Sequence, residues 1–384
     1  MTSNFKGAIE ASIITKSCGI TTVVGGPNLE AFPEETLSHY SIDYGIIGEG
    51  EIAFSKLVEA IENKNSIDSI EGLVYKENGA IKYNSPAIID DIDTLPFPAR
   101  HLLPMSNYTS IISVDPMTTM ITSRGCPYKC SFCYKQFSDT KVRFRNPLSV
   151  VDEMEFLVKR YNVKEIMFYD DTILLKQSHV EGICNEILRR NLKVRWESPS
   201  RVDRVNLPLL ELMKASGCVR LRYGVESGDK NILRAMNKQI NPEMVIKAFE
   251  LTRQAGIETF AYFMTGYMNE TRMAFENTLE LIGNIRADQV MITLATPYPK
   301  TLLEKQAIEA GKMPADYWRN FVLGEINSPL PPLVDGSEEW IKELYHKFYF
   351  NPVYIFNRLR RIRSLNQLKK HLMAGIGLIL FKTR

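Results

Sequence analysis

The sequence predicts an α/β protein whose main part is a partial (β/α)6 barrel of the TIM type. We expect an incomplete Rossmann-like unit before the barrel and a helical extension after it. Three observations predict this class. From about residue 115, short apolar strands alternate with helical segments six times, which is typical of parallel α/β architectures. Upstream, two strands end in glycines that lead into helices, and from residue 311 the chain is helical and rich in aromatic residues.

Residues 1–66 are predicted to form the Rossmann-like unit. We expect helices over 8–18, 33–40 and up to about 63, and strands over 21–27 and 43–47. The first strand ends at Gly25 and Gly26, and the second is followed by Gly48 and Glu49. Loops at the carboxyl ends of parallel strands face a ligand in such units, although a double glycine after a strand is most often only a tight turn.

Residues 67–110 are predicted to be a hairpin and an interdomain linker. Asn78-Gly79 lies between two alternating strands within 71–83, and this dipeptide is the strongest short hairpin signal. The prolines that follow, with few periodic features between them, indicate an ordered linker.

Residues 111–310 are predicted to form the barrel. Its strands are expected over 117–123, 165–169, 193–197, 219–225, 258–265 and 289–296. Its helices are expected over 147–161, 176–190, 207–216, 229–236, 242–255 and 271–285. In barrels of this type the active residues lie at the carboxyl ends of the strands. Residues 311–384 are assigned to the helical extension.

The bulk composition excludes several classes of protein. Of 384 residues, 45% are hydrophobic and 24% are charged, with a net charge of +2, so the chain is globular and no whole-chain charge favours nucleic acid as a partner. We see no signal peptide and no apolar run long enough to span a bilayer. The clustered cysteines favour metal ligation over a disulfide framework, and we expect a reducing cytoplasm.

Three of the six cysteines lie close together in the sequence. Cys126, Cys130 and Cys133 have the spacing C-x3-C-x2-C, while Cys18, Cys184 and Cys218 are scattered along the chain. Iron–sulfur clusters usually have four thiolate ligands, so three ligands would leave one iron open to a substrate. The alternative is a structural zinc site completed by a distant His or Cys, but the single C-x2-C pair and the dispersed histidines favour the cluster.

The stretch 124–134 resembles the cluster loop of the radical S-adenosylmethionine (radical SAM) enzymes, including the aromatic Phe132 before the last cysteine. The resemblance extends over about 115–310. Residues 24–27, 33–36 and 47–51 resemble the second half of a cobalamin-binding domain. That domain precedes the barrel in a class of these enzymes that includes magnesium-protoporphyrin monomethyl ester cyclases and methyltransferases. The first half, with its cobalt-ligating Asp-x-His-x-x-Gly motif, is not found in the sequence. The resemblance therefore leaves cobalamin binding open, with Gly25, Gly26, Gly48 and Glu49 as its candidate contacts.

The resemblance implies a [4Fe-4S] cluster on the three cysteines and SAM on the open iron. It also implies that Phe132 and residues at the ends of four strands contact the cofactor. The strand-end residues are Asp170 and Asp171, Arg201, Gly224, Glu226 and Ser227, and Thr296 with Pro297. From the residues alone, Asp170 or Asp171 could instead cap the next helix, and Arg201 could pair with Asp203.

The resemblance further implies that the chain cleaves SAM to a 5′-deoxyadenosyl radical. That radical would serve methylation, cyclisation or another C–H functionalisation of a small organic substrate. A reductant such as flavodoxin or ferredoxin would be required, and no nucleic acid is expected. A methylthiotransferase of RNA or protein and a non-catalytic cluster-binding fragment remain as alternatives. Residues 351–384 contain eight Lys or Arg and no acidic residue, which predicts either a weak membrane-surface contact or a solvated helical cap.

Overall fold

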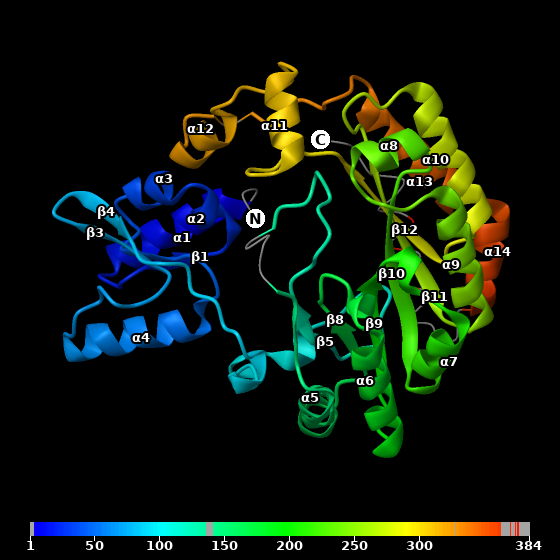
Figure 1. Ribbon diagram of the computed structural model, residues 1–384, viewed down its shortest axis with the longest axis horizontal. Helices are drawn as coiled ribbons and strands as arrows, with labels where there is room; N and C mark the ends of the chain where they lie inside the picture. Colours follow the sequence, from blue (N-terminus) through cyan, green and yellow to red (C-terminus); the bar gives the residue numbers. More distant parts are fainter. Residues whose placement is uncertain are drawn as a thin grey trace. The chain divides into compact units, whose positions relative to one another are not determined.

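A computed structural model describes residues 4–135, 141–326 and 328–361, together with residues 369, 373 and 375. The chain divides into two compact units (Figure 1). The first comprises Met1–Asp91, Phe132–Ser138 and Pro297–Pro331, and the second comprises Ile92–Ser131, Asp139–Thr296 and Pro332–Arg384. The domain boundaries predicted from the sequence stay predictions.

The second unit contains a parallel sheet of six strands in the order β12-β11-β10-β9-β8-β5. The strands are β5 (Met117–Met120), β8 (Glu165–Phe168), β9 (Arg195–Ser200), β10 (Cys218–Glu226), β11 (Glu258–Thr265) and β12 (Gln289–Leu294). Each strand neighbours the one before it in the chain, so every connection is a crossover that places a helix against the sheet. The sheet curls into a half-barrel (Figure 1), and the predicted fold class is confirmed.

The helices of this unit follow the predicted order. They are α5 (Pro147–Tyr161), α6 (Gln177–Arg189), α7 (Leu207–Ala215), α8 (Lys230–Ala235), α9 (Pro242–Gln254), α10 (Arg272–Ile285), α13 (Ser337–Tyr349) and α14 (Pro352–Arg361). Asn146, Asn206 and Asn241 accept a backbone N–H at the starts of α5, α7 and α9, each with proline at the first or second helical position. An Asn cap and an early proline are both favoured at helix starts. Short 3-10 turns lie at Ile92–Thr94, Arg100–Leu102, Met105–Asn107, Ile173–Leu175 and Val202–Arg204.

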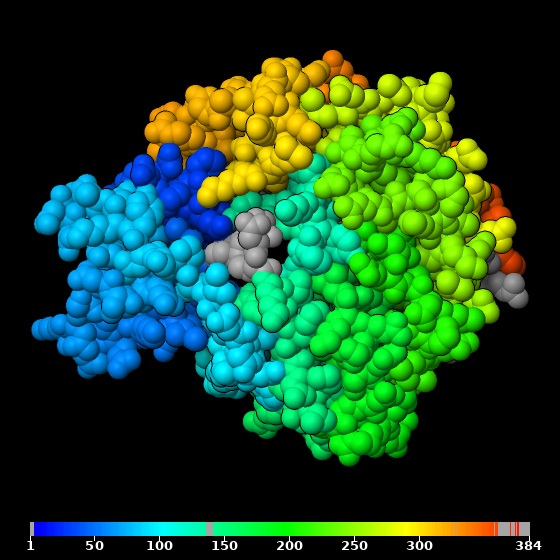
Figure 2. All heavy atoms as spheres, viewed as in Figure 1, coloured from blue at the N-terminus to red at the C-terminus, as the bar shows by residue number. Residues whose placement is uncertain are grey.

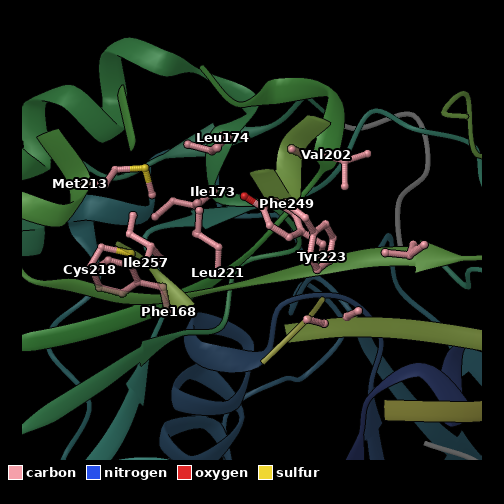
Figure 3. Close-up of a cluster of buried hydrophobic side chains, with 14 of the residues drawn as sticks. Phe168, Ile173, Leu174, Val202, Met213, Cys218, Leu221, Tyr223, Phe249 and Ile257 are labelled. Atoms are coloured by element: carbon pink, nitrogen blue, oxygen red, sulfur yellow. The ribbon is translucent and has the colours of Figure 1, made fainter. Parts of the chain in front are cut away.

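One core lies between this sheet and its helices. Figure 3 shows Phe168, Leu221, Tyr223 and Phe249 pointing into it from strands and helices. Cys184 and Cys218 are fully buried in the same core. The two buried thiols are therefore packing residues. In the space-filling view, the spheres of this part of the chain, drawn in green, pack closely against one another (Figure 2).

The strand predicted over 117–123 is divided into two. β5 ends at Met120, and β6 (Ser123–Arg124) pairs antiparallel with β7 (Arg143–Phe144). The backbone N–H of Thr122 donates to the Asp170 carboxylate at 2.7 Å. That side-chain contact turns the chain out of the six-stranded sheet.

The first unit contains a four-stranded sheet in the order β1-β2-β3-β4. The strands are β1 (Val23–Gly25), β2 (Tyr44–Ile46), β3 (Leu73–Glu77) and β4 (Ala80–Tyr83). β1 and β2 are parallel, as the Rossmann-like prediction requires. The predicted hairpin turns at Asn78 and Gly79, both at positive φ, and β3 extends the β1–β2 sheet.

The helices of the first unit are α1 (Phe5–Ser17), α2 (Pro27–Ala31), α3 (Pro33–Ser38), α4 (Gly50–Asn63), α11 (Leu302–Glu309) and α12 (Tyr317–Leu323). The short helix α2 was not predicted, because Pro27 starts it only two residues after the strand. Among the described residues, no helix is both long and apolar enough to cross a bilayer.

Candidate active site

The cysteine loop, which we define as Gly125 to Tyr134, follows β6 and has no regular secondary structure. Cys126 and Cys130 are half-buried in the second unit, and Cys133 is exposed in the segment assigned to the first. All six cysteines lie in the described part of the chain, and none forms a disulfide. Within the same residues, no three His, Cys, Asp or Glu side chains converge as a metal site. The donor set itself favours a cluster, since three thiols in one short loop suit iron–sulfur chemistry.

Charged side chains of both signs lie near Cys130. Burial raises the pKa of the Cys130 thiol and the charge of Glu226 acts in the same direction, whereas the charges of Lys238 and Arg201 act to lower that pKa. The Arg201 guanidinium also lies 3.6 Å from the centre of the Tyr128 ring. Thiolates bound to iron carry negative charge, which the charges of Lys238 and Arg201 would partly offset at Cys130.

Arg201, at the end of β9, is almost fully buried. Its Nε lies 2.9 Å from Asp203 Oδ1, and its Nη2 donates to the Lys238 carbonyl at 2.9 Å. The pairing with Asp203 that the sequence left open is thus present in the structure. A contact between Arg201 and the SAM carboxylate stays a prediction.

Glu226 and Lys238 form a buried ion pair where β10 ends. The Lys238 Nζ lies 2.6 Å from Glu226 Oε1, and Glu226 has a left-handed backbone with φ 67°. A Cβ on Gly224 would lie 2.6 Å from that Oε1 and 2.7 Å from the Nζ, so glycine leaves the space that the pair occupies. Sequence reasoning selected Gly224 and Glu226 but missed Lys238, because a lone lysine after a helix carries no local signal.

The remaining residues that were predicted to contact the cofactor are Ser227, Thr296, Pro297 and Phe132. The Ser227 hydroxyl is buried and accepts the Asp229 N–H at 3.1 Å. Thr296 Oγ1 donates to the Leu294 carbonyl at 3.3 Å. In the first unit, the Pro297 carbonyl accepts the Trp318 indole N–H at 2.7 Å, and Phe132 is half-buried.

Of the two aspartates after β8, only Asp170 is buried. It accepts hydrogen bonds from the Thr122 N–H, the Thr122 hydroxyl at 2.5 Å and the Ser123 hydroxyl at 2.7 Å. Burial raises its pKa. Asp170 therefore fixes the start of the cysteine loop, and Asp171 is the exposed member of the pair.

The predicted cobalamin contacts lie in the first unit. Gly25 ends β1 and Gly26 precedes α2. A Cβ on Gly48 would lie 2.2 Å from the Ala87 carbonyl oxygen, and Glu49 Oε2 accepts the Ile89 N–H at 2.7 Å. Packing within this unit thus accounts for Gly48 and Glu49, and a cobalamin contact at either stays a prediction.

The buried His179 side chain is expected to make the free energy of unfolding depend on pH. Burial, with Lys176 nearby, lowers its pKa to about 4, and its Nε2 lies 3.2 Å from Thr122 Oγ1. The unfolded chain therefore binds this proton more readily, and the stabilisation from neutral His179 is lost as the pH falls from 6.5 towards 4. We expect the difference in unfolding free energy between the wild type and His179→Gln to shrink by about 2 kcal/mol from pH 7 to pH 4.5. Urea unfolding at the two pH values measures this, and a pH-independent difference would contradict it.

Comparison with known proteins shows the family to which this chain belongs. The sequence profile of the radical SAM superfamily matches residues 120–282. A protein named uncharacterized methyltransferase PH0819, from Pyrococcus horikoshii, is 32% identical over 335 residues, which are 86% of this chain and 72% of the relative. The chain belongs to the radical SAM superfamily. The family recognised from the sequence is therefore confirmed, and the chain is an enzyme of a superfamily that uses a [4Fe-4S] cluster and SAM.

Two further proteins are similar over most of the chain. The anaerobic magnesium-protoporphyrin IX monomethyl ester cyclase of Rubrivivax gelatinosus is 27% identical, over 93% of this chain and 66% of the relative. The radical SAM methyltransferase TsrM of Kitasatospora setae, solved with cobalamin and a [4Fe-4S] cluster, gives a TM-score of 0.66 at 20% identity. The match covers 80% of this chain and 61% of TsrM. The chain thus spans slightly less than two thirds of the cyclase and of TsrM, and the likeness to TsrM shows the fold alone.

Proposed function

We propose that this radical SAM enzyme methylates a small organic substrate or closes a ring on it. The observation that carries this proposal is the 32% identity, over 86% of the chain, to the protein named uncharacterized methyltransferase PH0819, together with the cyclase similarity. A second cluster of the kind proposed for a methylthiotransferase has no support in this sequence, because the three cysteines outside the loop are far apart and two of them are core residues. They cannot supply a second ligand triplet.

In the proposed reaction, each group of site residues has its own role. Cys126, Cys130 and Cys133 would hold the cluster. When bound, the cluster supplies the electron that splits SAM into methionine and a 5′-deoxyadenosyl radical. Arg201 and Lys238 place positive charge beside the Cys130 thiol, and Glu226 would orient SAM. The protein's contribution is thus positioning and electrostatics, and the cofactors perform the bond cleavage.

The test of this function is anaerobic incubation of the reconstituted protein with SAM and a reductant. We expect 5′-deoxyadenosine to form, and we propose flavodoxin or ferredoxin as the natural reductant. A reducing compartment such as the cytoplasm suits the six cysteines, none of which forms a disulfide. Reconstituted protein that holds iron but releases no 5′-deoxyadenosine would contradict the proposal.

A substitution at Glu226 tests the proposed SAM contact. Glu226→Gln keeps the size of the side chain but removes its charge, so a charge-assisted contact to SAM would weaken by about 1–3 kcal/mol. Titration calorimetry with SAM, at unchanged iron content, measures the loss. Glu276→Gln is the matched control, because Glu276 is an exposed glutamate on α10. Equal SAM affinity in both variants would assign Glu226 a structural role.

We also propose that α14 contacts an anionic membrane surface. Tyr354 packs against Phe348 and Tyr349, while Val353, Phe356 and Leu359, spaced three residues apart, are 67%, 59% and 55% exposed. An apolar face within a basic segment suits the interface of anionic lipid.

Vesicle sedimentation tests this surface. We expect the protein to sediment with phosphatidylserine-containing vesicles and Phe356→Ser to bind them more weakly. Phosphatidylcholine vesicles should bind little protein. Equal sedimentation of the two variants, or no sedimentation with anionic vesicles, would favour the solvated cap that the sequence left open.

A further inference from the structure

The turn after α8 contacts the cysteine loop on both sides of Cys130. The Ser131 N–H donates to the Met236 carbonyl at 3.0 Å, and the Asn237 side-chain amide donates to the Lys129 carbonyl at 2.7 Å. All of these residues belong to the second unit. The residues before and after Cys130 are thus both tied to one turn.

The backbone of that turn explains why Asn237 is well placed. The Lys238 N–H donates to the Leu233 carbonyl at 3.0 Å and the Asn237 N–H donates to the Arg234 carbonyl at 2.9 Å. With Asn237 at φ 52°, this is the Schellman ending of a helix, where glycine is the usual left-handed residue. Asparagine tolerates the same conformation, and here its side chain makes a contact that glycine could not.

A buried tyrosine adds a third contact. The Tyr267 hydroxyl shares a hydrogen bond with Ser131 Oγ at 2.6 Å and donates to the Ala235 carbonyl at 3.1 Å. Tyr267 follows β11 and is fully buried. It therefore links the loop after β11, the end of α8 and the cysteine loop.

The same turn also contacts two residues that are predicted to bind SAM. Lys238 pairs with Glu226, and its carbonyl accepts from Arg201. One turn of three residues, Met236 to Lys238, thus contacts the cysteine loop, the end of β10 and the end of β9.

We propose that Asn237 and Tyr267 are positioning residues that clasp Lys129-Cys130-Ser131 and fix the Cys130 sulfur relative to the Glu226–Lys238 pair. The clasp is a property of the chain itself, and its consequence for iron rests on the proposed function. With the clasp weakened, Cys130 is still a ligand, but the loop opens more often and iron leaves faster.

Two variants with matched controls test the clasp. Asn237→Gly keeps the left-handed turn but removes the amide, and Asn191→Gly makes the same change in the Schellman turn after α6, where the Asn191 N–H donates to Leu188 and the Leu192 N–H to Ile187. Tyr267→Phe removes the clasping hydroxyl. Tyr223→Phe removes another buried hydroxyl in the same barrel, one bonded to Thr252.

The first readout is hydrogen exchange of the cysteine-loop peptide in the iron-free chain, measured by mass spectrometry. We expect faster exchange in Asn237→Gly and Tyr267→Phe, and wild-type exchange in Asn191→Gly and Tyr223→Phe. Loop exchange that is unchanged in both clasp variants overturns the proposal, whatever the iron content.

The second readout is the rate at which an iron chelator removes iron from anaerobically reconstituted protein, with the electron paramagnetic resonance spectrum of the reduced protein. We expect iron loss to be roughly five-fold faster in the clasp variants, the effect of one hydrogen bond of ordinary net strength, and an altered spectrum on addition of SAM. Faster loop exchange with wild-type iron loss and spectrum overturns the proposed role towards Cys130. Absence of iron from the wild type itself would instead contradict the proposed function, while the exchange result still decides the clasp.

Discussion

Replacing Cys130 with alanine is expected to lower the iron content of the reconstituted protein from about four per chain to less than one and to abolish SAM cleavage. An open-iron cluster has only three protein ligands, so the loss of one leaves no spare thiolate to replace it. Cys126→Ala and Cys133→Ala are expected to behave alike. Iron analysis and 5′-deoxyadenosine formation, both under anaerobic conditions, measure the effect.

The control for this result is Cys18→Ala, because Cys18 is exposed at the end of α1. It should retain full iron content and activity. Cys184→Ala and Cys218→Ala should cost stability, since both thiols are buried in the core, but should retain iron when folded. An equal requirement for any of these three cysteines would contradict the three-ligand site.

Replacing Arg220 with leucine is expected to give the largest loss of stability, about 3–5 kcal/mol in the free energy of unfolding. Arg220 is 1% exposed on β10, and its guanidinium lies 2.6 Å from Glu197 Oε2 and 2.7 Å from Glu258 Oε2. Its Nη2 also donates to the Ile112 carbonyl at 2.9 Å. Removing the cation would leave Glu197, which is fully buried, with Arg222 as its cationic partner among the described residues.

Arg272→Leu is the matched control for Arg220. Arg272 pairs with Glu343 at 2.7 Å, but both side chains are largely exposed, so this change should cost less than about 1 kcal/mol. Chemical denaturation of both variants measures the contrast. Similar losses in the two variants would show that burial of the Arg220 network adds nothing to stability.

The elements that the sequence predicted well have signals contained within a few residues. Asn146 followed by proline starts α5 at the predicted residue 147. Asn78-Gly79 turns the predicted hairpin. The regular alternation of apolar strands with helices was enough to predict a six-stranded parallel sheet, because consecutive parallel strands need a crossover helix.

The features that sequence reasoning missed depend on residues that meet only after folding. Lys238 reaches Glu226 across a left-handed turn, and Asp170 turns inward because the Thr122 N–H and hydroxyl meet it there. Gly48 was predicted as a cobalamin contact from its place after a strand, and the sequence did not show that the Ala87 backbone also leaves no room for a side chain there. These contacts join residues that are far apart in the sequence, so neither hydrophobic periodicity nor motif spacing predicts them.

Electron paramagnetic resonance of the reduced, anaerobically reconstituted protein, recorded before and after addition of SAM, tests most directly whether this chain holds a cluster with an open iron. We expect a four-iron signal that changes when SAM is added. A reduced protein without such a signal, or with a signal that SAM leaves unchanged, would contradict a SAM-binding cluster on Cys126, Cys130 and Cys133.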